Sequence, residues 1–468
     1  MGDKKQGLVL AFIILAEYHI LWNLLYPYLW KLPYQQFEFV YAICLLVVTV
    51  LYNSKRSFNS RGFIKGIQEP FNYRLTFEFV FVIALFIWFT ADCILQQCID
   101  GEHYIQKNDW KLFCSAMAAF VFFPFVRVVG IKSSKAVIDQ MIHVTVLIYT
   151  VFWAWVLWQY FHLNFVIFPS GNQLKMVGTH WLEAGINRNV TAAHSAVMLA
   201  LCIFMIVTQS KRTKTLYLFA AIVHIIVVML TDSRTSYVAV VCTICATVVI
   251  GLCRRYCFHR ASVIYIIKKS LLIAVFTVLC VIILGAIRKG TFVILDYCLQ
   301  MYKGDSFDPS TAISSLDDLD GRGAIWIGTI KVLLSSPKRF AIGVIPSQIG
   351  ITLKNLGLLK IRISHCHNVL LEVGASLGVP AMLLYAWFLF SIFRRCVHMI
   401  GLNSKQYAFV WTISIVLLCL VVIDMAESFL FGPTSANMPI FYMFAGWITE
   451  LDLNLKDDRY DKPALHLI

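Results

Sequence analysis

Long apolar segments separated by short polar ones make up most of this chain. Twelve of these segments reach or approach the roughly 20 residues that a helix needs to cross the hydrocarbon core of a membrane. They lie at 7–30, 37–52, 76–97, 112–126, 141–163, 190–209, 215–231, 235–253, 270–287, 369–393, 406–424 and 436–451. The pattern predicts an all-α polytopic integral membrane protein with about twelve transmembrane helices.

One apolar block, residues 214–253, is too long for a single span. A helix of that length would be about twice as long as the bilayer is thick. The block is interrupted only by the letters TDSRTS at 231–236. We therefore expect two helices joined by a tight turn at this point.

Composition agrees with a membrane protein. Hydrophobic residues make up 59% of the 468 residues and charged residues only 14%, whereas a soluble domain carries about 25% charged residues. Lys4 and Lys5 lead directly into the first apolar segment, and no small-x-small cleavage site follows. We therefore interpret this segment as a transmembrane helix and not as a removed signal peptide.

The distribution of lysine and arginine predicts the orientation of the chain. If the N-terminus is cytoplasmic, 24 of the 40 basic residues fall in inner segments and six in short outer segments. The other ten lie in one outer loop, 288–366, which is long enough to escape the charge rule. We expect a single membrane domain (1–468) with both termini in the cytoplasm, no basic residue inside a span, and one large extracytoplasmic loop.

This orientation also explains the net charge of +14. Most of the positive charge faces the anionic lipids of the inner leaflet, so membrane lipids are the expected partners and nucleic acid is not. No C-x-x-C pair or zinc-finger spacing occurs among the 14 cysteines.

The outer loop contains one segment with the pattern of a short amphipathic helix, GRGAIWIGTIKVLLSSP at 321–337. Asp320 is its expected N-cap and Pro337 its stop. The apolar residues of its expected amphipathic pattern are Ile325, Trp326, Ile330 and Leu333. Such a helix suits the outer membrane surface, either as a structural lid or as part of a binding site.

Two arginines on the outer side stand where a positive charge is unfavourable. Arg322 falls in the first turn of the amphipathic helix, against the helix dipole, and an anionic ligand would explain it. Arg234 lies in the TDSRTS turn, at the edge of the membrane. An ionisable residue at this depth indicates function, and the alternatives are a local ion pair with Asp232 or a snorkelling side chain.

The stretch SHCHN at 364–368 stands directly before an apolar run. His365, Cys366 and His367 carry metal-binding groups, but the outer loop offers no further His or Cys at a suitable spacing. Asn368 can cap the helix that begins near Val369. A histidine can also act as a general base near neutral pH, and arginines nearby would suit a diphosphate. This combination favours metal-independent glycosyl transfer from a lipid diphosphate carrier.

Several of these motifs resemble one known family, the O-antigen ligase and O-antigen polymerase superfamily. SHCHNVLLEVGASLGVPAMLL is similar to its His-Asn…Leu…Gly signature, and TDSRTS to its Ser-Arg-Thr motif. GRGAIWIGTIKVLLSSP resembles its Gly-Arg…Trp helix, and GINRNVTAAHSAVMLA its Asn-containing entry to a middle span. The resemblance covers about residues 180–450. One departure is Ser236, where the usual Ser-Arg-Thr-Gly motif has glycine, and we expect it to change the turn geometry but not the chemistry.

The resemblance implies roles for particular residues. His367 would be the base, while Arg322 and Arg234 would hold the diphosphate of an undecaprenyl-linked glycan. Substrate-binding roles fall to four further residues: Arg188, Asn189, His365 and Asn368. The family implies a metal-independent inverting glycosyltransferase without cofactor, in a C-type glycosyltransferase-like membrane fold.

The resemblance also implies a cellular setting. The enzyme would act at the outer face of the bacterial cytoplasmic membrane, in the synthesis of O-antigen, capsule or exopolysaccharide. Its partners would be the lipid-linked donor, a glycan or lipid A-core acceptor, and other polysaccharide assembly proteins. A ligase and a polymerase use the same donor, so the motifs do not separate them. The main alternative is a transporter or flippase of lipid-linked oligosaccharide, which would carry matched broken helices and intramembrane charges in its two halves.

Overall fold

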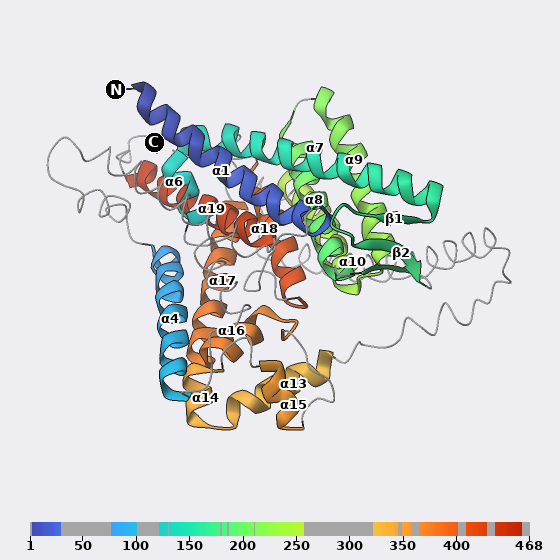
Figure 1. Cartoon of the computed structure of the whole chain (residues 1–468). Coiled ribbons are helices and arrows are strands. Elements are labelled where there is room, and N and C mark those ends of the chain that lie inside the picture. Colours follow the sequence, from blue (N-terminus) through green and yellow to red (C-terminus); the bar gives the residue numbers. More distant parts are fainter. Residues whose placement is uncertain are drawn as a thin grey trace.

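The structure is a computed structural model of the whole chain (Figure 1). It describes residues 2–29, 76–100, 121–129, 131–177, 180–184, 187–209, 211–256, 322–344, 349–357, 365–400, 409–427 and 436–460. The predicted spans at 37–52 and 270–287, most of 112–126, the loop residues 288–321 and the Asp320 cap lie outside the described residues.

The described residues are mostly helical, as predicted. The helices outside the large loop are α1 (Gly2–Leu29), α4 (Phe77–Asp100), α6 (Phe125–Val129), α7 (Ile131–Leu163), α8 (Arg188–Thr208), α9 (Lys211–Thr231), α10 (Arg234–Tyr256), α16 (Val369–Leu377), α17 (Val379–Ile400), α18 (Val410–Asp424) and α19 (Asn437–Tyr460). Within the described residues, six helices are long and apolar enough to cross a membrane. The chain is therefore an integral membrane protein.

The tight turn predicted inside the apolar block 214–253 is confirmed. Helix α9 ends at Thr231 and α10 begins at Arg234. Asp232 supplies the reversal with φ +47, a left-handed conformation that aspartate tolerates better than most residues. Helix α8 packs against α9, α10 and α18 and is the most deeply buried of the described spans.

The single span predicted at 369–393 is wrong, because the helix breaks at Gly378. The first part, α16, ends at Leu377, and α17 begins at Val379 with Pro380 in its first turn. Gly378 has φ +88, and a Cβ at this position would lie 2.2 Å from the backbone oxygen of Ala341. The break therefore allows the large outer loop to pack against the helix backbone, and Val344 N donates to Ala375 O at 2.6 Å.

The expectation that no basic residue lies inside a span is also wrong. Arg395 is part of α17, which extends to Ile400, and its side chain is buried. The guanidinium donates to both carboxylate oxygens of Glu78 in α4, at 2.8 and 3.0 Å, and to Asp452 in α19 at 2.5 Å. Ser391 and His398 complete this network. The two buried carboxylates compensate the charge that lipid would exclude.

A small β-sheet departs from the predicted all-α class. Strands β1 (Phe165–Ile167), β2 (Gln173–Val177) and β3 (His180–Ala184) form an antiparallel sheet between α7 and α8. In register, Val166 faces Leu174 and Leu174 faces Glu183. The β1–β2 turn bonds to the end of α1, since Ser170 N donates to Tyr28 O at 3.1 Å. The segment is too short and polar for a span, and its Pro-Ser-Gly turn favours a hairpin.

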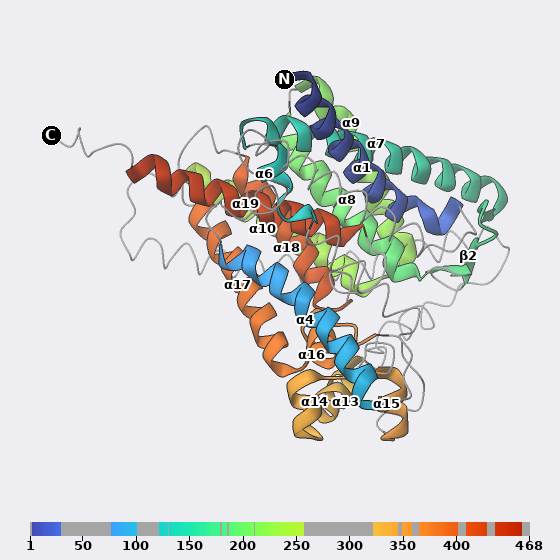
Figure 2. The same ribbon diagram turned by 60° about the vertical axis from the view of Figure 1, so that its left-hand side comes forward.

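The large loop builds a compact helical unit beyond the membrane helices. It contains α13 (Arg322–Leu334), α14 (Pro337–Ile342) and α15 (Ile349–Asn355), which lie together at one end of the molecule, away from the N-terminus (Figures 1 and 2). The unit has its own small core, formed by Val332, Ile349, Leu353, Cys366 and Ala375.

The predicted amphipathic helix is confirmed as α13. Ile325 and Leu333 are buried, whereas Ile327, Ile330 and Leu334 are exposed. The small residues Gly328 and Thr329 take the inner positions, because α16 packs close to α13. Pro337 follows the end of α13, as expected, and serves as the first residue of α14.

Candidate functional site

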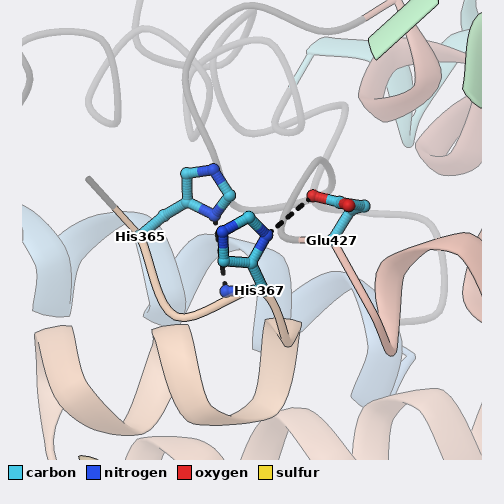
Figure 3. Close-up of side chains that lie close together, drawn as sticks. All are labelled: His365, His367 and Glu427. Carbon is cyan, nitrogen blue, oxygen red and sulfur yellow. Dashed lines mark hydrogen bonds and ion pairs between the residues drawn. The ribbon is translucent and has the colours of Figure 1, made fainter. Parts of the chain in front are cut away.

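The candidate site is organised around one buried carboxylate. Glu427 follows the end of α18, and its side chain is only 1% exposed. Its Oε1 accepts a hydrogen bond from Arg322 Nη2 at 2.6 Å, and its Oε2 lies 2.9 Å from Nδ1 of His367 (Figure 3). A single side chain therefore connects the predicted base with one of the predicted diphosphate-binding arginines.

Arg322 also contacts the turn between α9 and α10. Its Nη1 donates to Oγ1 of Thr235 at 2.7 Å, while Nη2 holds Glu427. The guanidinium is planar and can serve both acceptors at once because its donors point in fixed directions. Arg322 is thus placed by an internal anion, so the unfavourable charge in the first helical turn has a structural explanation in addition to any ligand.

Arg234 lies beside this contact in the chain. It is the first residue of α10 and precedes Thr235, to which Arg322 is bonded. The structure therefore brings together the two segments that carry the predicted arginines. Ser236, the departure from the family motif, is buried and donates to Oγ of Ser233 across the turn at 3.3 Å.

The SHCHN segment is fixed from two sides through Cys366. Trp326 Nε1 in α13 donates to Cys366 O at 3.2 Å, and Cys366 N donates to Glu372 Oε2 in α16 at 2.6 Å. Burial raises the pKa of the Cys366 thiol well above its ordinary value, and nearby Glu372 adds to this shift. The thiol stays protonated and packs beside Thr329, so Cys366 is a structural residue here.

His367 adopts a strained backbone conformation. Its φ of +52 lies in the left-handed region, which is uncommon for a residue with a side chain. Asn368 follows as the N-cap of α16: its Oδ1 accepts from Leu371 N at 3.1 Å, which confirms the predicted cap. Its Nδ2 donates to Met425 O at 2.8 Å. Asn368 therefore links the loop of His367 to the segment that carries Glu427. Backbone strain such as that of His367 tends to cluster at functional sites.

The ion pair defines the chemistry of the His367 ring. Glu427, paired with Arg322, presents carboxylate oxygens that only accept hydrogen bonds. Nδ1 of His367 is therefore the donor to Oε2, which leaves Nε2 as the ring nitrogen that can accept a proton from a substrate. The arrangement provides a base with a fixed orientation, next to a guanidinium.

His365 lies alongside His367 in Figure 3, with ring centroids 3.9 Å apart. Its Nδ1 accepts the backbone N–H of His367 at 3.3 Å. Burial lowers the pKa of His365 to about 4, helped by the neighbouring His367 and Arg322. This imidazole is therefore neutral near pH 7. One ligand atom from each of His365, His367 and Glu427 lies within 4.8 Å of the others, so these three residues can hold a metal ion.

Arg188 and Asn189 are not joined to this cluster by a described contact. Arg188 begins α8, and its Nη1 is buried without a hydrogen-bond partner among the described residues. The backbone N–H of Asn189 donates to the N-cap Asn187 at 2.9 Å. Helix α8 does pack against α10 and α18, which lead into the site. Their substrate-binding roles remain predictions.

Glu427 is the residue that sequence reasoning missed. It is the only acidic residue in the predicted outer segment 425–435, which contains no lysine or arginine. A single carboxylate at the membrane edge, on the same side as two arginines and a histidine, was the available signal. It was not used because Glu427 is separated from His367 by 60 residues and belongs to none of the recognised motifs.

A comparison with known protein families supports the recognition. Residues 219–386 match the family model described as O-antigen ligase. The match covers α10, α13 to α16 and parts of α9 and α17, and it includes Arg234, Arg322 and His367. For residues 219–386 this match confirms the resemblance to the O-antigen ligase and O-antigen polymerase superfamily. A search of the curated proteins finds no match.

Proposed function

We propose that this protein is a membrane glycosyltransferase that acts on an undecaprenyl-diphosphate-linked glycan. The observation that carries the proposal is the hydrogen-bonded chain from Thr235 through Arg322 and Glu427 to His367. It joins His367, the proposed base, to Arg322, the proposed phosphate-binding cation, within one small site. The O-antigen ligase domain supports the same reaction class.

In the proposed reaction His367 is the general base. Its Nε2 takes the proton of the acceptor hydroxyl while the oxygen attacks the anomeric carbon of the donor sugar. The bond from that carbon to the phosphate oxygen breaks, and the configuration at the anomeric carbon inverts. The undecaprenyl diphosphate leaves with its electron pair, and its negative charge is stabilised by Arg322 and Arg234.

Glu427 has a positioning role in this proposal. It holds the His367 ring by Nδ1 and stabilises the imidazolium that forms when Nε2 gains a proton, as the carboxylate of a catalytic triad does. The reaction needs no metal and no cofactor in this scheme. His365 and Asn368 support the loop, and Arg188 and Asn189 contact the substrate at the membrane edge.

The proposed location is the outer face of the bacterial cytoplasmic membrane. The site joins three segments that the charge pattern assigns to the outside: the α9–α10 turn, the large loop, and the segment after α18. The Glu78–Arg395–Asp452 network lies towards the other end of α17, near segments assigned to the cytoplasm. The acceptor is a growing glycan for a polymerase or a lipid A-core for a ligase.

The proposal is tested by His367→Ala in purified protein with a lipid-linked glycan donor and an acceptor. Loss of a general base lowers a rate by about 10²- to 10⁴-fold, and we expect transfer to fall by this factor while the protein remains folded. His365→Ala should reduce transfer less, because among the described residues Glu427 is hydrogen-bonded to the ring of His367 and not to that of His365. Transfer at the unmodified rate by His367→Ala would disprove the assignment.

A further inference from the structure

The two histidines and Glu427 form a group with a second chemical capability. His365 and His367 come from one loop and Glu427 from a segment 60 residues away in the chain. Figure 3 shows the two rings and the carboxylate side by side. Two imidazoles and one carboxylate form the set of three protein ligands that many zinc sites use, with a fourth position left for water.

The distances suit a small cation after a modest closure. The ligand atoms lie within 4.8 Å of one another, and ligands about 2.1 Å from a tetrahedral zinc ion are about 3.4 Å apart. His367 Nδ1 and Glu427 Oε2 lie 2.9 Å apart, and the proton of the hydrogen bond between them has to leave before both atoms can bind the same ion. His365 has to move by about 1–2 Å to reach this spacing. Among the described residues its hydrogen bond comes from the His367 amide and is long at 3.3 Å.

The surroundings also suit this ligand set. His365 Nδ1 already accepts a hydrogen bond from the His367 amide, so it carries the lone pair that a metal ion needs. Glu427 can ligate through Oε2 while Oε1 stays bonded to Arg322 at 2.6 Å. A ligand carboxylate that is itself hydrogen-bonded is common around metal ions. The charge of Arg322 weakens the affinity but does not remove a ligand.

We propose that His365, His367 and Glu427 form an inhibitory site for zinc. Imidazole and carboxylate ligands in this geometry favour zinc over magnesium, which keeps an octahedral shell of oxygen ligands. A bound ion turns the His367 ring toward itself and away from the acceptor hydroxyl. The inhibition rests on the function proposed above, whereas the binding of zinc does not.

The binding test uses the full-length chain with its cysteines replaced by serine, purified in detergent and titrated with zinc chloride by calorimetry. We expect one zinc ion per chain at the site and at least a tenfold loss of affinity in His365→Ala. The matched control is His398→Ala, which removes a histidine paired with Asp452 at the far end of α17. Equal zinc affinity in the parent protein, His365→Ala and His398→Ala would overturn the site.

The inhibition test follows glycan transfer in the same preparations. Zinc should inhibit the parent protein, EDTA should reverse the effect, and equimolar magnesium should have none. In His365→Ala, the zinc concentration that halves the remaining transfer activity should be at least tenfold higher than in the parent protein. If His365→Ala loses zinc binding but zinc leaves transfer by the parent protein unchanged, the metal site stands and the role of His367 as base is overturned.

Discussion

Arg322 is held by two acceptors that approach from different parts of the chain. Thr235 belongs to the first turn of α10, and Glu427 follows α18. With its charge balanced internally, the guanidinium is oriented before any substrate arrives. Preorganised donors of this kind stabilise developing negative charge at little cost in reorganisation. The planar geometry of Arg322, and not only its charge, should therefore matter for transfer.

Lysine substitutions test this geometry. Arg322→Lys keeps the charge but cannot hold Thr235, Glu427 and a diphosphate together, and a hydrogen bond to a charged group is worth about 1.5–3 kcal/mol. We expect transfer to fall by about 10- to 100-fold in Arg322→Lys and in Arg234→Lys, with unchanged expression. The control is Arg339→Lys in α14, whose side chain is half-buried and donates to Oγ of Ser335 outside the site. Unchanged rates in both site variants would assign these arginines to packing.

Local sequence predicted the individual groups of the site better than their connections. The sequence around each group made it noticeable. A positive charge is unfavourable at Arg234 and Arg322, and asparagine is a favoured cap at position 368, directly after His367. Glu427 could not be assigned, because its importance comes from two partners that the fold brings to it from elsewhere in the chain. Contacts between distant segments are set by helix packing, which no local pattern encodes.

At the level of elements, the break between α16 and α17 determines how the large loop meets the membrane helices. The backbone at Gly343 packs against α16, and the backbone at Gly378 packs against α14. A Cβ at Gly343 would lie 2.4 Å from Ala375 O. The two backbones approach closely because neither glycine carries a side chain. Apolar periodicity continued through residue 378 and predicted one helix. The break at Gly378 was not predicted, because Gly378 and Pro380 are surrounded by apolar residues that favour a continuous span.

Gly378→Ala should therefore loosen the loop. The residue has φ +88 and ψ 167, a region that is almost closed to other amino acids and costs about 1–3 kcal/mol. Its Cβ would also overlap Ala341 O. We expect a lower melting temperature in detergent together with reduced transfer. Gly251→Ala in α10 is the control, since no atom lies within 4 Å of its added Cβ. Equal melting of both variants would contradict the close packing.

At the scale of the whole molecule, α17 connects two polar centres. Its N-terminal end adjoins the loop unit below the site, and Arg395 near its other end binds Glu78 and Asp452. At 1.5 Å per residue its 22 residues span about 33 Å, close to the thickness of the hydrocarbon core. The membrane architecture was predictable from apolar segments. The network around Arg395 was not predictable, because an arginine at the end of a span is ordinarily expected to be exposed to solvent.

Removal of Arg395 tests the contribution of this network. Arg395→Gln would leave two buried carboxylates without their cation, and breaking a buried ion pair costs about 3–5 kcal/mol. We expect a large drop in melting temperature in detergent and a low yield of folded protein. Arg394→Gln provides the matched control, because Arg394 is exposed on the same turn of α17. Similar stability of the two variants would show that lipid or water compensates the carboxylates.

The shared carboxylate of Glu427 has a consequence for product release. In the proposed reaction the leaving lipid diphosphate is a better ligand for arginine than the donor, because it carries an additional negative charge. The negative charge of Glu427 also attracts Arg322, so Glu427 competes with the product for the guanidinium. Glu427→Gln removes that competing charge while keeping the side-chain shape. We expect undecaprenyl diphosphate to inhibit this variant at about tenfold lower concentration than the parent protein. The transfer step should also be slower. Initial rates with added product measure both effects. Unchanged product inhibition would mean that Glu427 acts on His367 alone, and turnover would then depend on how the lipid itself leaves the membrane edge.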